Sequence, residues 1–204
     1  WTRIAGLGIP KGGNFQVFAP NQNENVYTNN WTGPFYGFER AIESYELTDK
    51  PYRFKPIDIY YHSYIVSKTA SLNSLHKVYQ WALKQPVFPV YSSEYIEKVL
   101  DFNDFVIART PEGYRFRGNG DLKTVRWTDE KNHINFADSP QVAGFNRYNG
   151  QNYVHLLASN TDLVTQSANN TLPYVESTNA RINRFARSKN ALDLSLTGYQ
   201  PISI

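Results

Sequence analysis

The chain has 204 residues, of which 41% are hydrophobic and 15% aromatic, so it has enough apolar material for a folded core and is not a disordered protein. The formal net charge is only +3, and no run of Lys or Arg exceeds two residues, so the sequence does not favour nucleic-acid binding. Cysteine is absent, which excludes disulfides, thiol nucleophiles and cysteine-bound metals.

Methionine is also absent, which indicates a fragment or an excised mature piece of a longer polypeptide. No apolar run is long enough to span a membrane, and no export signal is visible.

The first predicted element is a strand over residues 15–19, which follows a Gly-rich turn and alternates apolar with polar side chains until Pro20. The segment behind it has neither helical nor strand periodicity and is rich in amides and aromatic rings. It is either an Asn-rich connector or a saccharide-binding loop, since amides match sugar hydroxyls and flat rings support a pyranose. The binding interpretation selects Asn21, Asn23, Glu24, Tyr27, Trp31 and Tyr36.

The next elements are a helix over 37–47, with apolar residues on one face, and a buried strand over 57–62 that ends at His62. The order strand, loop, helix, strand is the crossover pattern of a parallel sheet or barrel. Because ligand sites lie at the carboxyl ends of such strands, His62 is a candidate for chemistry. The structural alternative is a hydrogen-bonded histidine in the core or on its rim.

Two further helices are expected, over 71–84 and 93–101, with a short strand over 87–91 between them. Ser71 or Thr69 is the predicted N-cap of the first helix. His76 on this helix has no partner at metal-ligand spacing, so it is interpreted as a partly exposed helix residue.

From residue 102 the helical spacing gives way to short strands separated by turns, which predicts an antiparallel β-sandwich over 102–204. The clearest pair is 142–148 with 152–158, joined by an Asn-Gly turn. Later strands are expected around 174–175, 181–187 and 191–196. His133 and His155 are interpreted as structural, and Asp193 is placed on the solvent face of its strand.

Four blocks in order resemble the deacetylase region of PelA-type proteins of Pel exopolysaccharide biosynthesis: 18–29, 31–38, 53–62 and 92–95. The resemblance implies a fold in which residues 1–101 are the C-terminal portion of a (β/α) barrel and residues 102–204 a jelly-roll-like β-sandwich. It also implies a periplasmic or secreted enzyme that removes acetyl groups from an amino-sugar polysaccharide. Its expected partners are that polymer, the upstream domains of the same polypeptide and other exopolysaccharide export proteins.

The resemblance further implies a divalent, zinc-type metal held by an Asp and two His that activates water, and a late-strand His that protonates the leaving amine. His62 matches that last position, and Asn23, Glu24, Trp31 and Tyr61 are expected to line the groove. The metal-ligand and base motifs lie nearer the N-terminus of such proteins and no counterpart occurs here, so the fragment is expected to be inactive alone.

The alternative hypothesis is a non-catalytic carbohydrate-binding or scaffolding module. Exposed aromatic side chains in a row on one face of the sandwich would favour it, and the candidates for that row are Tyr114, Phe116, Trp127 and Tyr148.

Overall fold

The computed structural model describes residues 7–18, 38–47, 56–59, 61, 63–120, 122–128, 131–148 and 150–204. The chain forms two compact units, which divide between Val87 and Phe88. The sequence placed its boundary between residues 101 and 102. The difference is helix α3 (Ser92–Asp104), which belongs to the second unit. Among the described residues, the search for a helix both long and apolar enough to cross a bilayer finds none.

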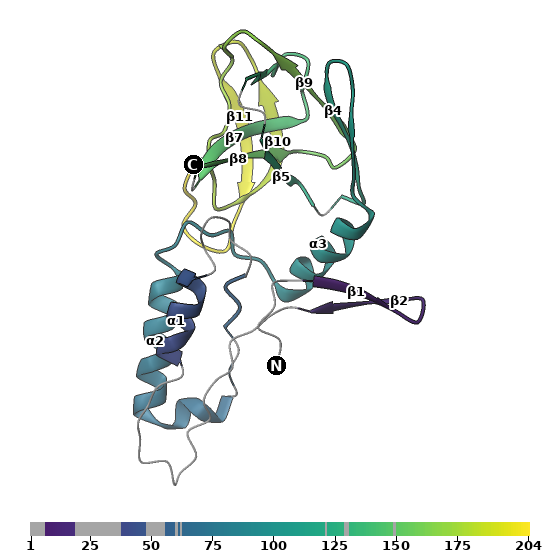
Figure 1. Cartoon of the computed structure of the whole chain (residues 1–204). Coiled ribbons are helices and arrows are strands. Elements are labelled where there is room, and N and C mark those ends of the chain that lie inside the picture. Colours follow the sequence, from purple (N-terminus) through teal and green to yellow (C-terminus); the bar gives the residue numbers. More distant parts are fainter. Residues whose placement is uncertain are drawn as a thin grey trace. The chain divides into compact units, whose positions relative to one another are not determined.

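The first unit combines a hairpin with two helices (Figure 1). Strands β1 (Leu7–Lys11) and β2 (Asn14–Phe18) pair in antiparallel fashion around Gly12 and Gly13, whose φ angles of 59° and 81° suit glycine. The remaining elements of this unit are α1 (Phe38–Leu47), the 3₁₀ helix η1 (Ser63–Ser67) and α2 (Thr69–Ala82).

The two helices of the first unit pack against each other through aromatic and aliphatic side chains. The ring of Tyr45 on α1 stacks on Trp81 of α2 with a centroid distance of 5.6 Å. Leu75 and Val78 of α2 are buried, and Ile42 and Ile59 pack against them. Both predicted helices are thereby confirmed, because apolar residues at helical spacing meet across one interface.

The predicted strand and cap that flank α2 differ from what is observed. Of the described residues 56–59 and 61, none lies in a strand. Ile59 makes an isolated bridge, and its side chain packs on α2. The N-cap of α2 is Lys68, without a side-chain cap bond, and the Ser71 Oγ is buried without a hydrogen-bond partner. Within the part of the chain described here, β2 pairs in antiparallel fashion, and no barrel is detected.

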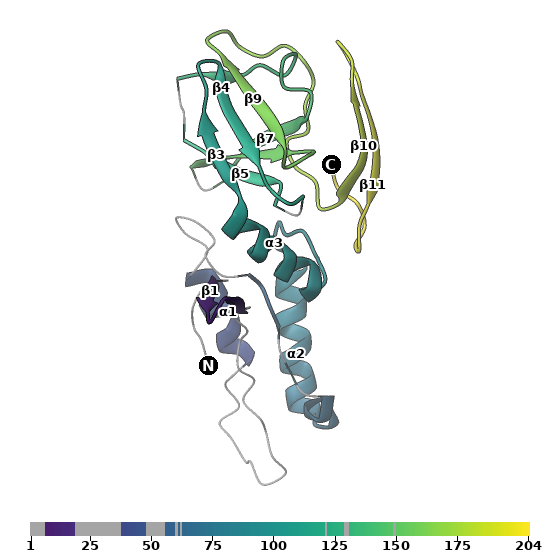
Figure 2. The ribbon, with the colours of Figure 1, turned by 90° about the vertical axis from the view of Figure 1, so that its right-hand side faces the viewer.

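The second unit begins with α3 and continues as three antiparallel sheets (Figures 1 and 2). The four-stranded sheet has the order β3-β4-β9-β6, the three-stranded sheet the order β5-β8-β7, and β10 pairs with β11. The strands are β3 (Val106–Arg109), β4 (Gly113–Arg117), β5 (Thr124–Trp127), β6 (His133–Ile134), β7 (Val142–Tyr148), β8 (Gln151–Leu156), β9 (Thr161–Gln166), β10 (Arg181–Arg187) and β11 (Leu192–Thr197).

One apolar core joins the four-stranded sheet to the three-stranded sheet. Phe116 and Leu163 come from the first sheet, and Trp127, Val154 and Leu156 from the second. The prediction of an antiparallel β-rich half is therefore confirmed, including the pairing of β7 with β8 and the strand over 181–187.

Two short strands predicted from apolar runs are not found. Residues 87–91 form no strand and lead directly into α3. Val175 also lies outside the strands. It belongs to a segment without regular secondary structure, and its backbone N–H donates to the carbonyl of Ala143 on β7.

The side chain of Arg187 connects hairpin β10–β11 to the core of the second unit. Figure 2 shows this hairpin beside the other strands. The Arg187 guanidinium donates to the carbonyl oxygens of Val142 and Ala143, both at 2.9 Å, and of Pro173 at 2.8 Å. It also lies over the ring of Phe136, 4.3 Å from its centroid. Burial lowers the pKa of this guanidinium, and the hydrogen bonds to the backbone carbonyls offset part of that cost to the charged form.

Candidate functional site

Most of the site predicted from the sequence lies outside the described residues. This applies to His62 and to the loop residues Asn21, Asn23, Glu24, Tyr27, Trp31 and Tyr36. The proximity of His62 to that loop therefore stays a prediction.

Tyr61 is the member of the predicted site that the structure describes. Its side chain is 39% exposed and contacts Tyr79 of α2 edge to face, with the centroids 6.5 Å apart. Nearby, the Tyr45 hydroxyl donates to the Asp58 carbonyl oxygen at 2.5 Å, and burial raises the pKa of the Asp58 carboxyl. The chain leading to residue 62 is thus anchored on α1 and α2, with an aromatic ring left accessible to a ligand.

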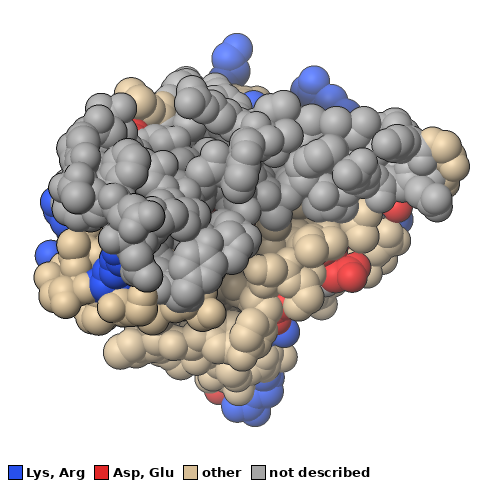
Figure 3. Space-filling view, turned by 90° about the horizontal axis from the view of Figure 1, so that it is seen from below, with Lys and Arg blue, Asp and Glu red and all other residues tan. Residues whose placement is uncertain are grey.

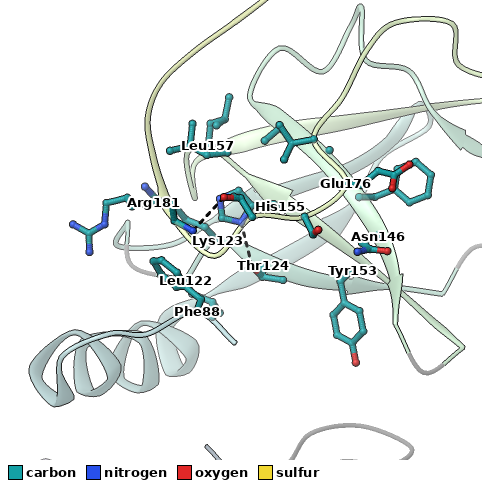
Figure 4. Close-up of a pocket in the computed structure, with 18 of the residues that line it drawn as sticks. Phe88, Leu122, Lys123, Thr124, Asn146, Tyr153, His155, Leu157, Glu176 and Arg181 are labelled. Carbon is teal, nitrogen blue, oxygen red and sulfur yellow. Dashed lines mark hydrogen bonds between the residues drawn. The ribbon is translucent and has the colours of Figure 1, made fainter. Parts of the chain in front are cut away.

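The second unit contains a cavity of about 520 Å³ that the sequence did not predict (Figure 4). Its floor is the face of the β5-β8-β7 sheet opposite the core. Thr124 and Gly144 flank His155 across this sheet, and Tyr153 and Asn146 form the neighbouring row. The intervening Val154 and Leu156 point into the core, so the period of two along β8 places His155 in the cavity.

The wall of the cavity is the segment 175–182, which crosses β7 at Gly144. A Cβ atom at this glycine would lie within 2.0 Å of the Val175 carbonyl oxygen. The crossing is fixed by the hydrogen bond from the Val175 N–H to the Ala143 carbonyl, 3.1 Å long. Glycine at 144 is therefore required because the two backbones approach too closely for any side chain.

A buried carboxylate holds the loop that leads into β5. Asp101 of α3 is 1% exposed. Its Oδ1 accepts the backbone N–H of Asn119 at 2.5 Å, and its Oδ2 that of Leu122 at 2.7 Å. These two bonds position Leu122 and Lys123, which line the cavity beside the floor.

His155 is the titratable group at the floor of the cavity. Its Nδ1 lies 3.2 Å from the Thr124 Oγ1, the contact drawn as a dashed line in Figure 4. Burial, and then the positive charges of Lys123 and Lys98, lower the pKa of the imidazole to about 4. At neutral pH the ring is uncharged, so one nitrogen can donate and the other can accept a hydrogen bond.

The charged side chains that line the cavity are mostly basic: Lys98, Lys123, Arg181 and Glu176. Arg181 pairs with Glu94 of α3, with 2.6 Å between Nη2 and Oε1. On the wider surface, Figure 3 shows a face on which charged side chains of the described residues stand singly or in small groups. The cavity itself gathers several cations around a neutral imidazole.

The described residues do not provide a metal site. No three His, Asp or Glu side chains come together in the ranges that the structure covers. His76 on α2 and His133 on β6 are exposed, as expected for a helix surface and a strand edge. The ligand set that the resemblance implies is not found in these ranges, and no catalytic step is assigned to a metal here.

The aromatic row proposed for the sandwich surface is not present. Phe116 and Trp127 are buried in the core, Tyr114 is half-buried and packs against it, and Tyr148 is the exposed member of the four. The structural interpretation of His155 stays a prediction, and the strand pattern places its side chain on the face opposite Val154 and Leu156. That alternation was the available signal, but it could not show that a later segment covers this face.

Comparison of the chain with models of protein families, with curated proteins and with solved structures finds no match.

Proposed function

We propose that this chain is the C-terminal part of a metal-dependent polysaccharide N-deacetylase acting on an N-acetylated amino-sugar exopolysaccharide. The observation that carries the proposal is the ordered set of blocks 18–29, 31–38, 53–62 and 92–95, which resemble the deacetylase region of PelA-type proteins. In this proposal the first part of the chain completes a (β/α) barrel, and the antiparallel sheets form a jelly-roll-like sandwich. The protein acts in the periplasm or outside the cell.

The block that the structure describes in full, residues 92–95, has a structural task. It forms the first turn of α3, where the Glu94 carboxylate accepts the backbone N–H of Tyr91 at 3.3 Å. The same carboxylate pairs with Arg181 of β10. This block therefore joins α3 to the last hairpin, and the catalytic part of the proposal depends on the other three blocks.

In the proposed reaction, His62 is the general acid. Hydrolysis of an acetamido group releases an amine, and the amine nitrogen must gain a proton as the tetrahedral intermediate collapses. An imidazole has an unperturbed pKa of about 6.5, so it can hold that proton near neutral pH and transfer it over hydrogen-bond distance. Asn21, Asn23, Glu24 and the nearby aromatic side chains would hold the sugar through paired hydrogen bonds and ring faces.

The test uses the longer natural polypeptide, because the ligands of the metal are expected upstream of this chain. Acetate release from N-acetylated hexosamine oligomers is measured with and without a chelator. His62→Ala should reduce turnover by roughly 100-fold or more while leaving the fold intact. His76→Ala is the matched control, since that side chain is exposed on α2. Turnover that survives chelation, or an active His62→Ala protein, would contradict the proposal.

A second candidate function is a non-catalytic carbohydrate-binding module, favoured by the cavity over the β5-β8-β7 sheet. The two candidates separate in the same assay, because a binding module would retain oligosaccharides without releasing acetate. Because Phe116 and Trp127 are buried, the predicted aromatic row cannot bind a sugar, and the cavity is the binding site that this second candidate uses.

A further inference from the structure

The cavity over the β5-β8-β7 sheet has the size of a small-molecule site. Its volume of about 520 Å³ lies within the range of roughly 300–1,000 Å³ that such sites occupy. Its walls come from parts of the chain that are distant in sequence, and one of them is fixed by the Gly144 crossing and the clamp that Arg187 makes. The hollow is therefore built into the fold of the second unit.

The uncharged groups in the cavity suit a saccharide. The neutral imidazole of His155 combines a donor with an acceptor, and the Asn146 amide and the Ser177 hydroxyl provide both functions as well. Tyr153 and Phe88 add aromatic surface for the apolar face of a sugar ring. Hydroxyl and acetamido groups carry the same mixture of donors and acceptors.

The charges in the cavity disfavour a cationic ligand. Lys98 and Lys123 lie close enough to His155 to oppose its protonation, and Arg181 adds a third cation that Glu94 partly neutralises. A ligand ammonium at the same place would meet the same combination of burial and positive charge as a protonated imidazole. Among the described residues that line the cavity, three charged side chains are basic and one, Glu176, is acidic.

We propose that this cavity binds uncharged, N-acetylated sugar units of the polymer and excludes the deacetylated, positively charged units. The identity of the polymer rests on the proposed function. The difference between substrate and product of the deacetylation is one positive charge per sugar, and the cavity is arranged to detect it. The second unit would then keep the protein on stretches of polymer that still carry acetyl groups.

The experiment measures binding to the 204-residue chain by isothermal titration calorimetry at neutral pH. The probes are tetramers of N-acetylglucosamine and N-acetylgalactosamine, their fully deacetylated counterparts, and a galacturonic acid tetramer. At least one acetylated tetramer should bind, and its deacetylated counterpart should bind roughly tenfold more weakly or worse. In amide NMR spectra, shifts should concentrate at residues 144–146, 153–155 and 175–178.

The variants assign the preference to the cavity charges. Lys98→Gln combined with Lys123→Gln should narrow the difference in affinity between the two tetramers to about threefold or less. Lys189→Gln, which removes an exposed lysine outside the cavity, should change neither affinity. Tyr153→Ala should weaken binding of the acetylated tetramer, because it removes ring surface from the floor.

Several results would overturn the proposal: no saturable binding of any acetylated tetramer, equal or tighter binding of the deacetylated one, or tightest binding of the galacturonic acid tetramer, which would make the cavity an anion site. The assay needs no turnover, so it is independent of His62. A preference for acetylated tetramers together with an inactive longer polypeptide would refute the deacetylase function and leave the binding inference standing.

Discussion

Replacing Arg187 should destabilise the second unit more than any other single surface change on β10. The guanidinium makes three hydrogen bonds of 2.8–2.9 Å to backbone carbonyls and a longer one of 3.4 Å to the Phe136 carbonyl. A hydrogen bond to a charged group contributes about 1.5–3 kcal/mol. The cost of burying the charge offsets part of that sum. We therefore expect Arg187→Ala to lower the free energy of unfolding by about 3–4 kcal/mol.

The same strand supplies the control. Arg184 pairs with Asp193 at 3.0 Å, but both side chains are more than half exposed, at 68% and 61%. Arg184→Ala should therefore cost about 0–1 kcal/mol. Arg187→Lys should fall between the two, because one ammonium group cannot reach all the carbonyls that the guanidinium spans.

The assay is urea denaturation followed through signals that belong to the second unit. Methyl NMR resonances of Val142, Val154 and Leu156 report on its core, which separates its unfolding from that of the first unit. Unchanged m-values would show that the variants alter stability and not the surface exposed on unfolding. If Arg187→Ala costs no more than Arg184→Ala, the guanidinium does not hold the hairpin and the reasoning is wrong.

Three further predictions concern the cavity and its supports. Gly144→Ala should displace the segment 175–182, with a loss of about 2–4 kcal/mol in the free energy of unfolding, detectable as faster exchange of the Val175 amide. Asp101→Ala leaves two backbone N–H groups without their acceptor and should cost about 2–4 kcal/mol in the same denaturation assay. The pH dependence of stability should reveal His155. Above about pH 6.5 its imidazole is neutral in the folded and in the unfolded protein. As the pH falls from about 6.5 toward about 4, the unfolded protein binds a proton there and the folded protein does not, so the free energy of unfolding decreases, by at most about 3 kcal/mol.

Each of these three predictions has a control variant. Gly150→Ala adds a methyl group in open space, at a φ of 77°, and should cost only about 1–2 kcal/mol of backbone strain. Asp104→Ala, at an exposed position of the same helix, is the comparison for Asp101→Ala. His155→Gln should flatten the pH profile between about 6.5 and 4. The charged groups that face the imidazole are the same in both proteins and cancel in the comparison: Lys98, Lys123, Glu176 and Arg181. A variant with an unchanged profile would refute the assignment.

The elements that the sequence predicted correctly are those determined by neighbouring residues. The spacing of Leu75 and Val78 predicts α2, and the Asn-Gly turn signal between 142–148 and 152–158 predicts the pairing of β7 with β8, because each pattern is contained in a few turns or a few residues. The strand over 57–62 failed since an apolar run does not reveal whether it will pair with a strand or pack on a helix. Ile59 packs on α2.

The cavity could not have been predicted in the same way. It depends on the approach of 175–182 to β7, and nothing near Val175 in the sequence identifies its contact with Gly144. The chemistry of His155 follows from that burial and from two lysines on other elements. Its role therefore arises from long-range packing, whereas the candidates Asn21, Glu24 and His62 were selected from local composition and a resemblance.

The bare backbone at position 144 gives a way to recognise the same architecture in other chains. A protein that shares the strand pair 142–148 and 151–156 but has a side chain at this position would have to route its following segment elsewhere. It would then lack the hollow, however similar its other residues were. Glycine at this one place is thus a practical marker for sorting related sequences into those that can accommodate a ligand over this sheet and those that cannot.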